Sequence, residues 1–222
     1  MKIQTIFNKK GLTLIELLIG LVICGMVVAG VYRLFINQSK AYTVQDQVAE
    51  VQQSIRSAME ILLRDLRMTG FDDDNALSTV TIASPIDSPL SDTSLKVNYE
   101  YYDTATLTYK KYTVAYWRDA GTSRLYRQLY INDVSVPNTT DNPNPAILLE
   151  NFDALNFSYG IDTNSDGAVE SWVASGGVGS NKVIAVRVTL TARPTQVNPD
   201  LQMVSPRTLV SAVTFRNLVI KN

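Results

Sequence analysis

The stretch KKGLTLIELLIGLVICGMVVAGVYRLFI, residues 9–36, decides how this chain is arranged. Two lysines and a glycine precede an apolar run from Leu12 to Ile36, and about 20 such residues suffice for a helix to cross a bilayer. Lysines before a membrane segment keep that end in the cytoplasm, so the remainder of the chain lies on the other side. The stretch predicts one membrane-spanning helix over residues 12–36, followed by a body outside the cytoplasm.

Glu16 stands near the start of this apolar run. A lone charge in hydrocarbon costs about 2.5–3.5 kcal/mol even on the mildest scale, so the carboxylate needs a partner. A plain single-pass anchor accounts for the length of the run but leaves Glu16 unexplained. An ordinary secretory signal peptide, cut after Val27-Val28-Ala29, is the other alternative, although the run is long for a signal peptide and contains an acid.

Basic residues, a glycine, apolar residues and a glutamate follow one another in the order that resembles the processing site of type IV prepilins. The resemblance implies that residues 1–11 are a leader, which prepilin peptidase removes by cutting between Gly11 and Leu12, and that Leu12 is then N-methylated. It also implies an assembly role for Glu16, whose carboxylate pairs with the Leu12 amine of a neighbouring subunit. The chain is then expected in the bacterial inner membrane and later in the pilus, near its tip.

The composition excludes several classes of function. The chain contains no histidine and a single cysteine, Cys24, so the usual zinc sites and Cys-His or Ser-His-Asp catalytic sites cannot form. Its net charge of −1 gives no basic field for nucleic acid. No residue spacing points to an active site or to a small-molecule substrate, so we expect a protein that is not an enzyme.

The helical period continues beyond the membrane run. Apolar residues recur at steps of three and four, and no proline occurs between Leu12 and Thr69. We expect residues 37–70 to form the amphipathic half of the same helix, with Gly70 as its C-terminal cap. The stripe that should pack against a sheet consists of Val44, Val48, Val51, Ile55, Met59, Leu62 and Leu66.

From Phe71 onward the apolar period changes to two. Strands that follow one long helix, without helices between them, predict an antiparallel sheet and the α+β class, so residues 71–222 should form a periplasmic sheet domain. Aromatic residues fill these strands, which favours a role in sheet packing over a ligand platform. The expected strands are residues 94–102, 107–118, 124–132, 152–160, 182–192 and 211–220.

Four further segments resemble the PilW family of minor pilins: MEILLRDLRMTGF (59–71), LYRQ (125–128), FSYGID (157–162) and TFRN (214–217). Together with the N-terminal motif, this resemblance implies a type IV pilin-like fold. It implies a minor pilin that co-assembles with other minor pilins and with the major pilin, and that initiates or caps type IV pili. The alternatives are a J-type minor pseudopilin of type II secretion, a pilus-tip adhesin, or a DNA-uptake receptor.

The loop DTNSDGAVE, residues 162–170, is the candidate metal site. Oxygen ligands at alternate positions, followed by a glycine, reproduce the first half of an EF-hand loop, so calcium is the expected ion. Val173 stands where the EF-hand has its bidentate glutamate, so other oxygens would have to complete the site. An Asx-rich turn without metal is the alternative. The expected ligands are Asp162, Asn164, Asp166, the Ala168 carbonyl and Glu170.

Overall fold

The computed structural model describes residues 12–73, 77–139, 143–194 and 205–220. The chain divides into two compact units at the boundary between Asp46 and Gln47. Helix α1, Leu14–Met68, contributes residues to both units. Each unit is described by itself.

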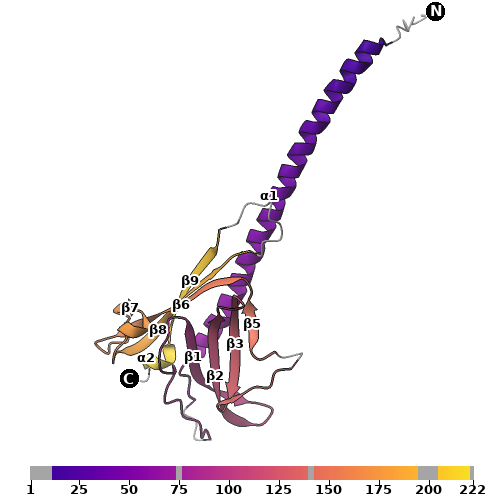
Figure 1. Cartoon of the computed structure of the whole chain (residues 1–222). Helices are drawn as coiled ribbons and strands as arrows, with labels where there is room; N and C mark the ends of the chain where they lie inside the picture. Colours follow the sequence, from indigo (N-terminus) through magenta and orange to yellow (C-terminus); the bar gives the residue numbers. More distant parts are fainter. Residues whose placement is uncertain (1–11, 74–76, 140–142, 195–204, 221–222) are drawn as a thin grey trace, which may run out of the picture. The chain divides into compact units, whose positions relative to one another are not determined.

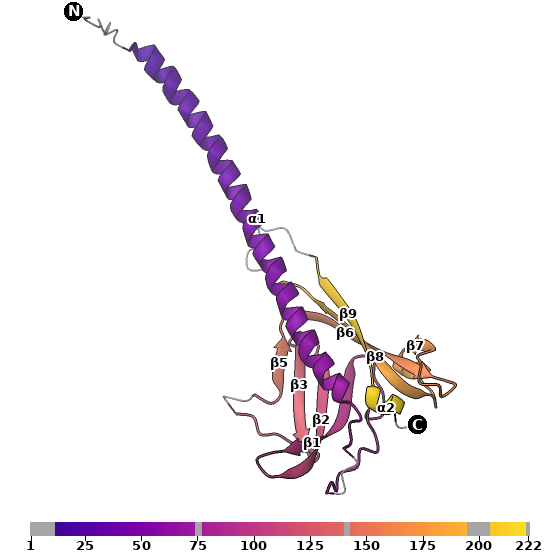
Figure 2. The same ribbon diagram turned by 180° about the vertical axis from the view of Figure 1, so that it is seen from behind.

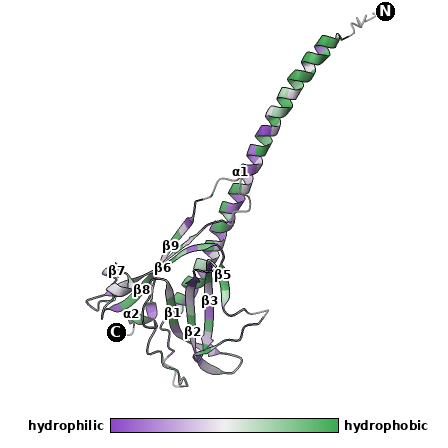
Figure 3. Ribbon diagram, viewed as in Figure 1, coloured by the Kyte–Doolittle hydropathy of each residue, from purple (hydrophilic) through white to green (hydrophobic). Residues whose placement is uncertain are grey.

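The first unit contains the apolar part of α1. An 18-residue window of this helix has a mean hydropathy of 2.6 and no buried residue, which gives it the length and composition of a membrane span. Figure 3 shows the N-terminal turns as almost uniformly hydrophobic, in contrast to the mixed colours further along the helix. Apolar side chains such as Leu14 and Met26 are exposed, so they favour an apolar environment such as lipid.

The C-terminal part of α1 belongs to the second unit and packs one face into its core. The predicted apolar stripe is confirmed from Val51 to Leu66, whereas Val44 and Val48 are only half-buried. The helix ends at Met68, and Gly70 adopts a left-handed backbone with φ of 71°, as its predicted capping role requires. The buried residues are Val51, Ile55, Ala58, Met59, Leu62, Asp65 and Leu66.

Over its described residues the body forms two antiparallel sheets, where the sequence predicted one (Figure 1). The strands of the first sheet are β1 (Ser94–Asp103), β2 (Thr108–Asp119), β3 (Arg124–Ile131), β4 (Val134–Ser135) and β5 (Ala146–Leu149). Those of the second sheet are β6 (Phe152–Asp162), β7 (Ser171–Val173), β8 (Lys182–Ala192) and β9 (Arg207–Thr214), and a 3-10 turn, η1, covers Ser175–Gly177. The first sheet has the order β1-β2-β3-β4, with β5 also pairing with β3, and the second has the order β7-β6-β8-β9.

One core joins the C-terminal part of α1 to both sheets. In Figure 2, strands β5, β3 and β2 lie to the left of this part of the helix, and β9, β6 and β8 lie to the right. Leu62 and Leu66 of the helix pack with inward residues of both sheets, such as Leu125 and Phe157. The α+β fold with one long N-terminal helix is therefore confirmed.

The prediction for the last strand was wrong at both ends. Strand β9 begins at Arg207 and ends at Thr214, and residues Arg216–Ile220 form a short helix, α2. Phe215 is fully buried, and its amide donates to the carbonyl of Ile184, which ends the strand and turns the chain. Beyond it the Asn217 side chain donates to the carbonyl of Thr69, at 3.2 Å, so this segment closes over the end of α1.

Candidate assembly and metal-binding sites

Glu16 makes its contacts with the residue that precedes helix α1. Its Oε2 accepts hydrogen bonds from the backbone N of Thr13 at 3.0 Å and from the Thr13 hydroxyl at 2.9 Å. In return, the Glu16 amide donates to the Thr13 hydroxyl oxygen at 3.3 Å. This reciprocal pattern between an N-cap threonine and a glutamate three residues later is a capping box.

The capping box gives Glu16 a partner within its own chain, which the sequence reasoning overlooked although Thr13-Leu14-Ile15-Glu16 has the required spacing. The carboxylate is held beside the backbone of Thr13, one residue after Leu12. Cleavage before Leu12 would therefore create a cationic amine next to this carboxylate. Gly11 and the rest of the predicted leader lie outside the described residues.

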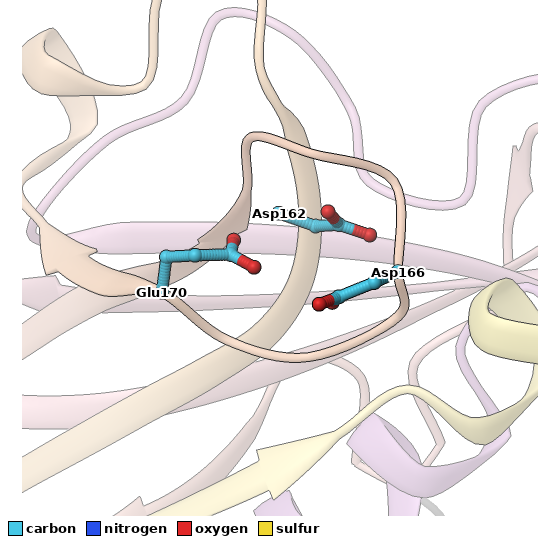
Figure 4. Close-up of side chains that lie close together, drawn as sticks. All are labelled: Asp162, Asp166 and Glu170. Carbon is cyan, nitrogen blue, oxygen red and sulfur yellow. The ribbon is translucent and has the colours of Figure 1, made fainter.

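The loop between β6 and β7 brings three carboxylates together. Ligand oxygens of Asp162, Asp166 and Glu170 all lie within 4.8 Å of one another, and Figure 4 shows the three side chains pointing toward the inside of the loop. Asp162 is buried at the end of β6, whereas the other two are exposed. Two oxygens bound to one calcium ion at 2.3–2.6 Å lie at most about 5 Å apart, so this spacing fits a single ion.

Backbone amides of the loop hold these side chains in place. Asp162 accepts from the amides of Ser165 at 2.5 Å and Gly167 at 3.0 Å, and Glu170 accepts from the amide of Thr163 at 2.9 Å. Hydrogen bonds from the Ala168 amide and from the Asn164 side chain hold the pKa of Asp166 below its usual value. The Asp166 carboxylate is therefore ionised at neutral pH.

The remaining predicted ligands are arranged differently. The Asn164 side-chain oxygen accepts from the Asp166 amide at 3.0 Å, and its nitrogen donates to the Asp166 carboxylate at 3.1 Å, so Asn164 serves the turn itself. Gly167 adopts a positive φ of 82°, as a sharp turn requires. The loop thus has three converging carboxylates and also the Asx-turn hydrogen bonds of the metal-free alternative.

The body also contains a buried charged cluster that the sequence pattern did not predict. Asp65, on the apolar face of α1, accepts hydrogen bonds from the Tyr116 hydroxyl at 2.5 Å and from Nε of Arg127 at 2.7 Å. Burial and the nearby Asp65 carboxylate raise the pKa of Tyr116 well above its usual value, so it remains a hydrogen-bond donor. The cluster fixes the helix on the sheet.

Comparison with known protein families gives two matches. Residues 111–215 match the model described as type IV pilus-assembly protein W, PilW, and residues 6–32 match the prokaryotic N-terminal methylation motif. The first match runs from within β2 to the end of β9, and the second covers the predicted processing site and the capping box. No curated protein matched the chain, and no solved structure matched it.

Proposed function

We propose, with the support of these two matches, that the chain is a type IV minor-pilin-like protein and that it is a membrane-anchored subunit which initiates or caps type IV pili. Prepilin peptidase removes residues 1–11, Leu12 is N-methylated, and the subunit co-assembles with other minor pilins and with the major pilin. Domains of the pilin family are structural, so the function is carried by packing of helices and of folded bodies. The body lies in the periplasm before assembly.

The observation that carries this proposal is the start of α1, where one acid caps a helix whose apolar side chains are exposed. The exposed run needs an apolar environment, which both the bilayer and a bundle of similar helices supply. In the proposed filament, the Leu12 amine of a neighbouring subunit takes the place of the capping contact on Glu16. A charge pair formed in this way avoids most of the cost that either charge would incur alone in an apolar surrounding.

Mass spectrometry of the native N-terminus tests the processing step. A chain that begins with methylated Leu12 is the expected result. A chain that retains residues 1–11, or that begins at Gly30, would overturn the proposal. Deletion of the gene should reduce pilus number without changing protein secretion, whereas lost secretion with normal pili would indicate a type II secretion pseudopilin.

Two matched variants separate the assembly role of Glu16 from its capping role. Glu16→Gln keeps a capping-box residue but removes the charge, and Thr13→Ala keeps the charge but removes the capping hydroxyl. We expect Glu16→Gln to block entry into filaments and Thr13→Ala to leave it near normal, measured in sheared pilus fractions. Normal entry of Glu16→Gln together with a defect in Thr13→Ala would show that Glu16 acts only as a cap.

We also propose that the loop of Asp162, Asp166 and Glu170 binds calcium. Three carboxylates held within 4.8 Å repel one another, and a divalent cation removes this repulsion. Calorimetric titration of the full chain in detergent with calcium chloride should show heat that Asp166→Asn abolishes. Asp119→Asn is the matched control, because Asp119 sits in another turn and accepts from the Gly121 amide in the same way. Absence of heat with the unaltered chain would mean that the loop is an Asx-rich turn that binds no calcium.

A further inference from the structure

A cavity of about 460 Å³ lies beside strands β1 and β2. It is bounded by the segment 87–91, by Ser94–Lys96 of β1 and by Ala115–Trp117 of β2. Its volume falls in the range of small-molecule sites, roughly 300–1,000 Å³. Neither the assembly contacts of α1 nor the acidic loop lies among its lining residues.

Hydrogen bonds fix both ends of the segment 87–91, which forms one wall of this cavity. At one end, the Asn98 side chain donates to Asp87 at 2.6 Å and to the carbonyl of Ser84 at 2.7 Å. At the other end, the hydroxyl of Tyr159 donates to the carbonyl of Ser91 at 2.6 Å. A ligand would therefore enter a site whose shape already exists, which lowers the entropy cost of binding.

The lining combines an aromatic ring with hydroxyl groups. The half-buried indole of Trp117 stacks on Tyr126, with ring centroids 5.5 Å apart and planes inclined by 19°, so its orientation is fixed. Ser88, Ser91 and Ser94 surround the same space. Sugars present both C–H faces, which pack on aromatic rings, and hydroxyl edges, which exchange hydrogen bonds with groups of this kind.

One charge in the lining has no carboxylate partner. Nζ of Lys96 lies 5.6 Å from the centroid of the Tyr130 ring, and no ion pair of Lys96 occurs among residues 12–73, 77–139, 143–194 and 205–220. Asp87, by contrast, is bound by the Asn98 amide. A ligand carboxylate would pair with the Lys96 ammonium, while the second oxygen of Asp87 accepts a sugar hydroxyl.

From these observations we infer that the cavity beside Trp117 binds a short acidic saccharide, such as one built of uronic acids. Trp117 packs against the face of a sugar ring, Lys96 binds its carboxylate, and the serine hydroxyls bind its hydroxyl groups. This inference is independent of how the subunit is assembled. It gives the body a contact with a surface polysaccharide in addition to its role in the filament.

Intrinsic fluorescence can test the inference, because the chain has only two tryptophans. The second, Trp172, lies on β7 in the other sheet, stacked under Arg187 at 4.1 Å, so Trp172→Phe leaves Trp117 as the single reporter. The full chain in detergent micelles is titrated with trigalacturonate, and with neutral maltotriose for comparison. A saturable change with trigalacturonate is expected, with maltotriose at least about tenfold weaker.

Lys96→Met in the same background should weaken trigalacturonate binding at least about tenfold and remove the preference for the acidic sugar. Lys110→Met is the matched control, because Lys110 lies on β2, is paired with Asp103 and is absent from the cavity lining. No saturable change with trigalacturonate, or equal weakening by both lysine variants, would overturn the inference. Displacement of the sugar signal by an apolar tripeptide such as Leu-Pro-Phe, with no preference between sugars, would show a peptide site instead. Normal pilus assembly by Lys96→Met would keep this result separate from the proposed function.

Discussion

Nε of Arg127, on strand β3, lies 2.7 Å from Oδ2 of Asp65, on helix α1, and both side chains are largely shielded from water. The hydroxyl of Tyr116 donates to the same carboxylate oxygen. A charge in the apolar stripe of a helix is tolerated only where the opposite charge and further hydrogen bonds meet it. The pair therefore allows one position of α1 along the sheet and penalises others.

Removing one member of this cluster should be more harmful than replacing all of it. Asp65→Ala leaves the Arg127 charge buried without a partner, and we expect a loss of about 3–5 kcal/mol in the free energy of unfolding. Asp65→Leu combined with Arg127→Met and Tyr116→Phe replaces the cluster by apolar groups. This triple variant should lose much less unfolding free energy than Asp65→Ala. Arg64→Met is the control, because Arg64 is exposed and its Nε lies 3.7 Å from Oδ1 of Asp65. This variant should lose under about 1 kcal/mol of unfolding free energy. Urea unfolding in micelles gives these values, and a triple variant as unstable as Asp65→Ala would contradict the explanation.

Buried tyrosines predict how stability depends on alkaline pH. Burial raises the pKa of Tyr99 and of Tyr159 to about 12 and also raises that of Tyr116, whereas an unfolded tyrosine ionises near pH 10. Because the folded-state pKa is the higher one, the contribution of these tyrosines to the free energy of unfolding is complete below pH 10. It is lost as the pH rises from about 10 to 12. Circular dichroism should show unfolding in this range, together with a second wave of tyrosine absorbance at 295 nm. A single wave near pH 10 for all 11 tyrosines, with unchanged circular dichroism, would contradict this.

The turn after α1 should not tolerate a side chain. Gly70 has φ of 71°, and a Cβ at this position would lie 2.7 Å from Cδ2 of Leu218. A left-handed backbone costs a non-glycine residue about 1–2 kcal/mol, and the contact adds to it, so Gly70→Ala should lower unfolding free energy by about 2–3 kcal/mol. Gly176→Ala, whose Cβ would meet nothing within 4 Å, should change it by less than about 0.5 kcal/mol. The same urea titration compares the two glycine variants. Equal unfolding free energies would mean that the Leu218 side chain moves aside without loss of stability.

Asn98 should control the order of the segment that precedes β1. Its side chain donates to Asp87 and to the Ser84 carbonyl, and accepts from the Thr113 hydroxyl at 2.5 Å. Asn98→Ala leaves these groups without their partner and should cost about 1–3 kcal/mol. Hydrogen exchange of the amides in residues 84–92 should accelerate, while exchange in β8 changes little. Asn181→Ala, which removes one side-chain bond at 3.0 Å, is the control.

The sequence allowed the helix and most strands to be predicted because these depend on local periodicity. Ile55, Leu62 and Leu66 repeat at helical spacing, while the alternation along β8 and the aromatic and β-branched residues of β2 mark strands without reference to any partner. The end of β9 was mispredicted because an apolar segment of five or six residues fits a strand or a helical turn equally well. Burial of Phe215, a tertiary contact, decided it.

Contacts between distant segments could not be predicted. Asp65 meets Arg127 only because β2 and β3 pair in a register that sets Tyr116 opposite Arg127, and nothing near Asp65 in the sequence indicates this. The division into two sheets has the same origin. The acidic loop and the Thr13–Glu16 capping box were accessible because their members lie within nine and four residues of sequence, although only the loop was found.

The hydrogen bond from Asn217 to Thr69 spans 148 positions of the chain. During synthesis at roughly 5–20 residues per second, Thr69 therefore waits about 7–30 s before the segment that closes over it has been made. In the proposed topology the membrane helix is already inserted by then, while the apolar face around Leu62 and Leu66 lacks its last covering strand. A chaperone that protects the nascent body would act in this interval, and on this helix end.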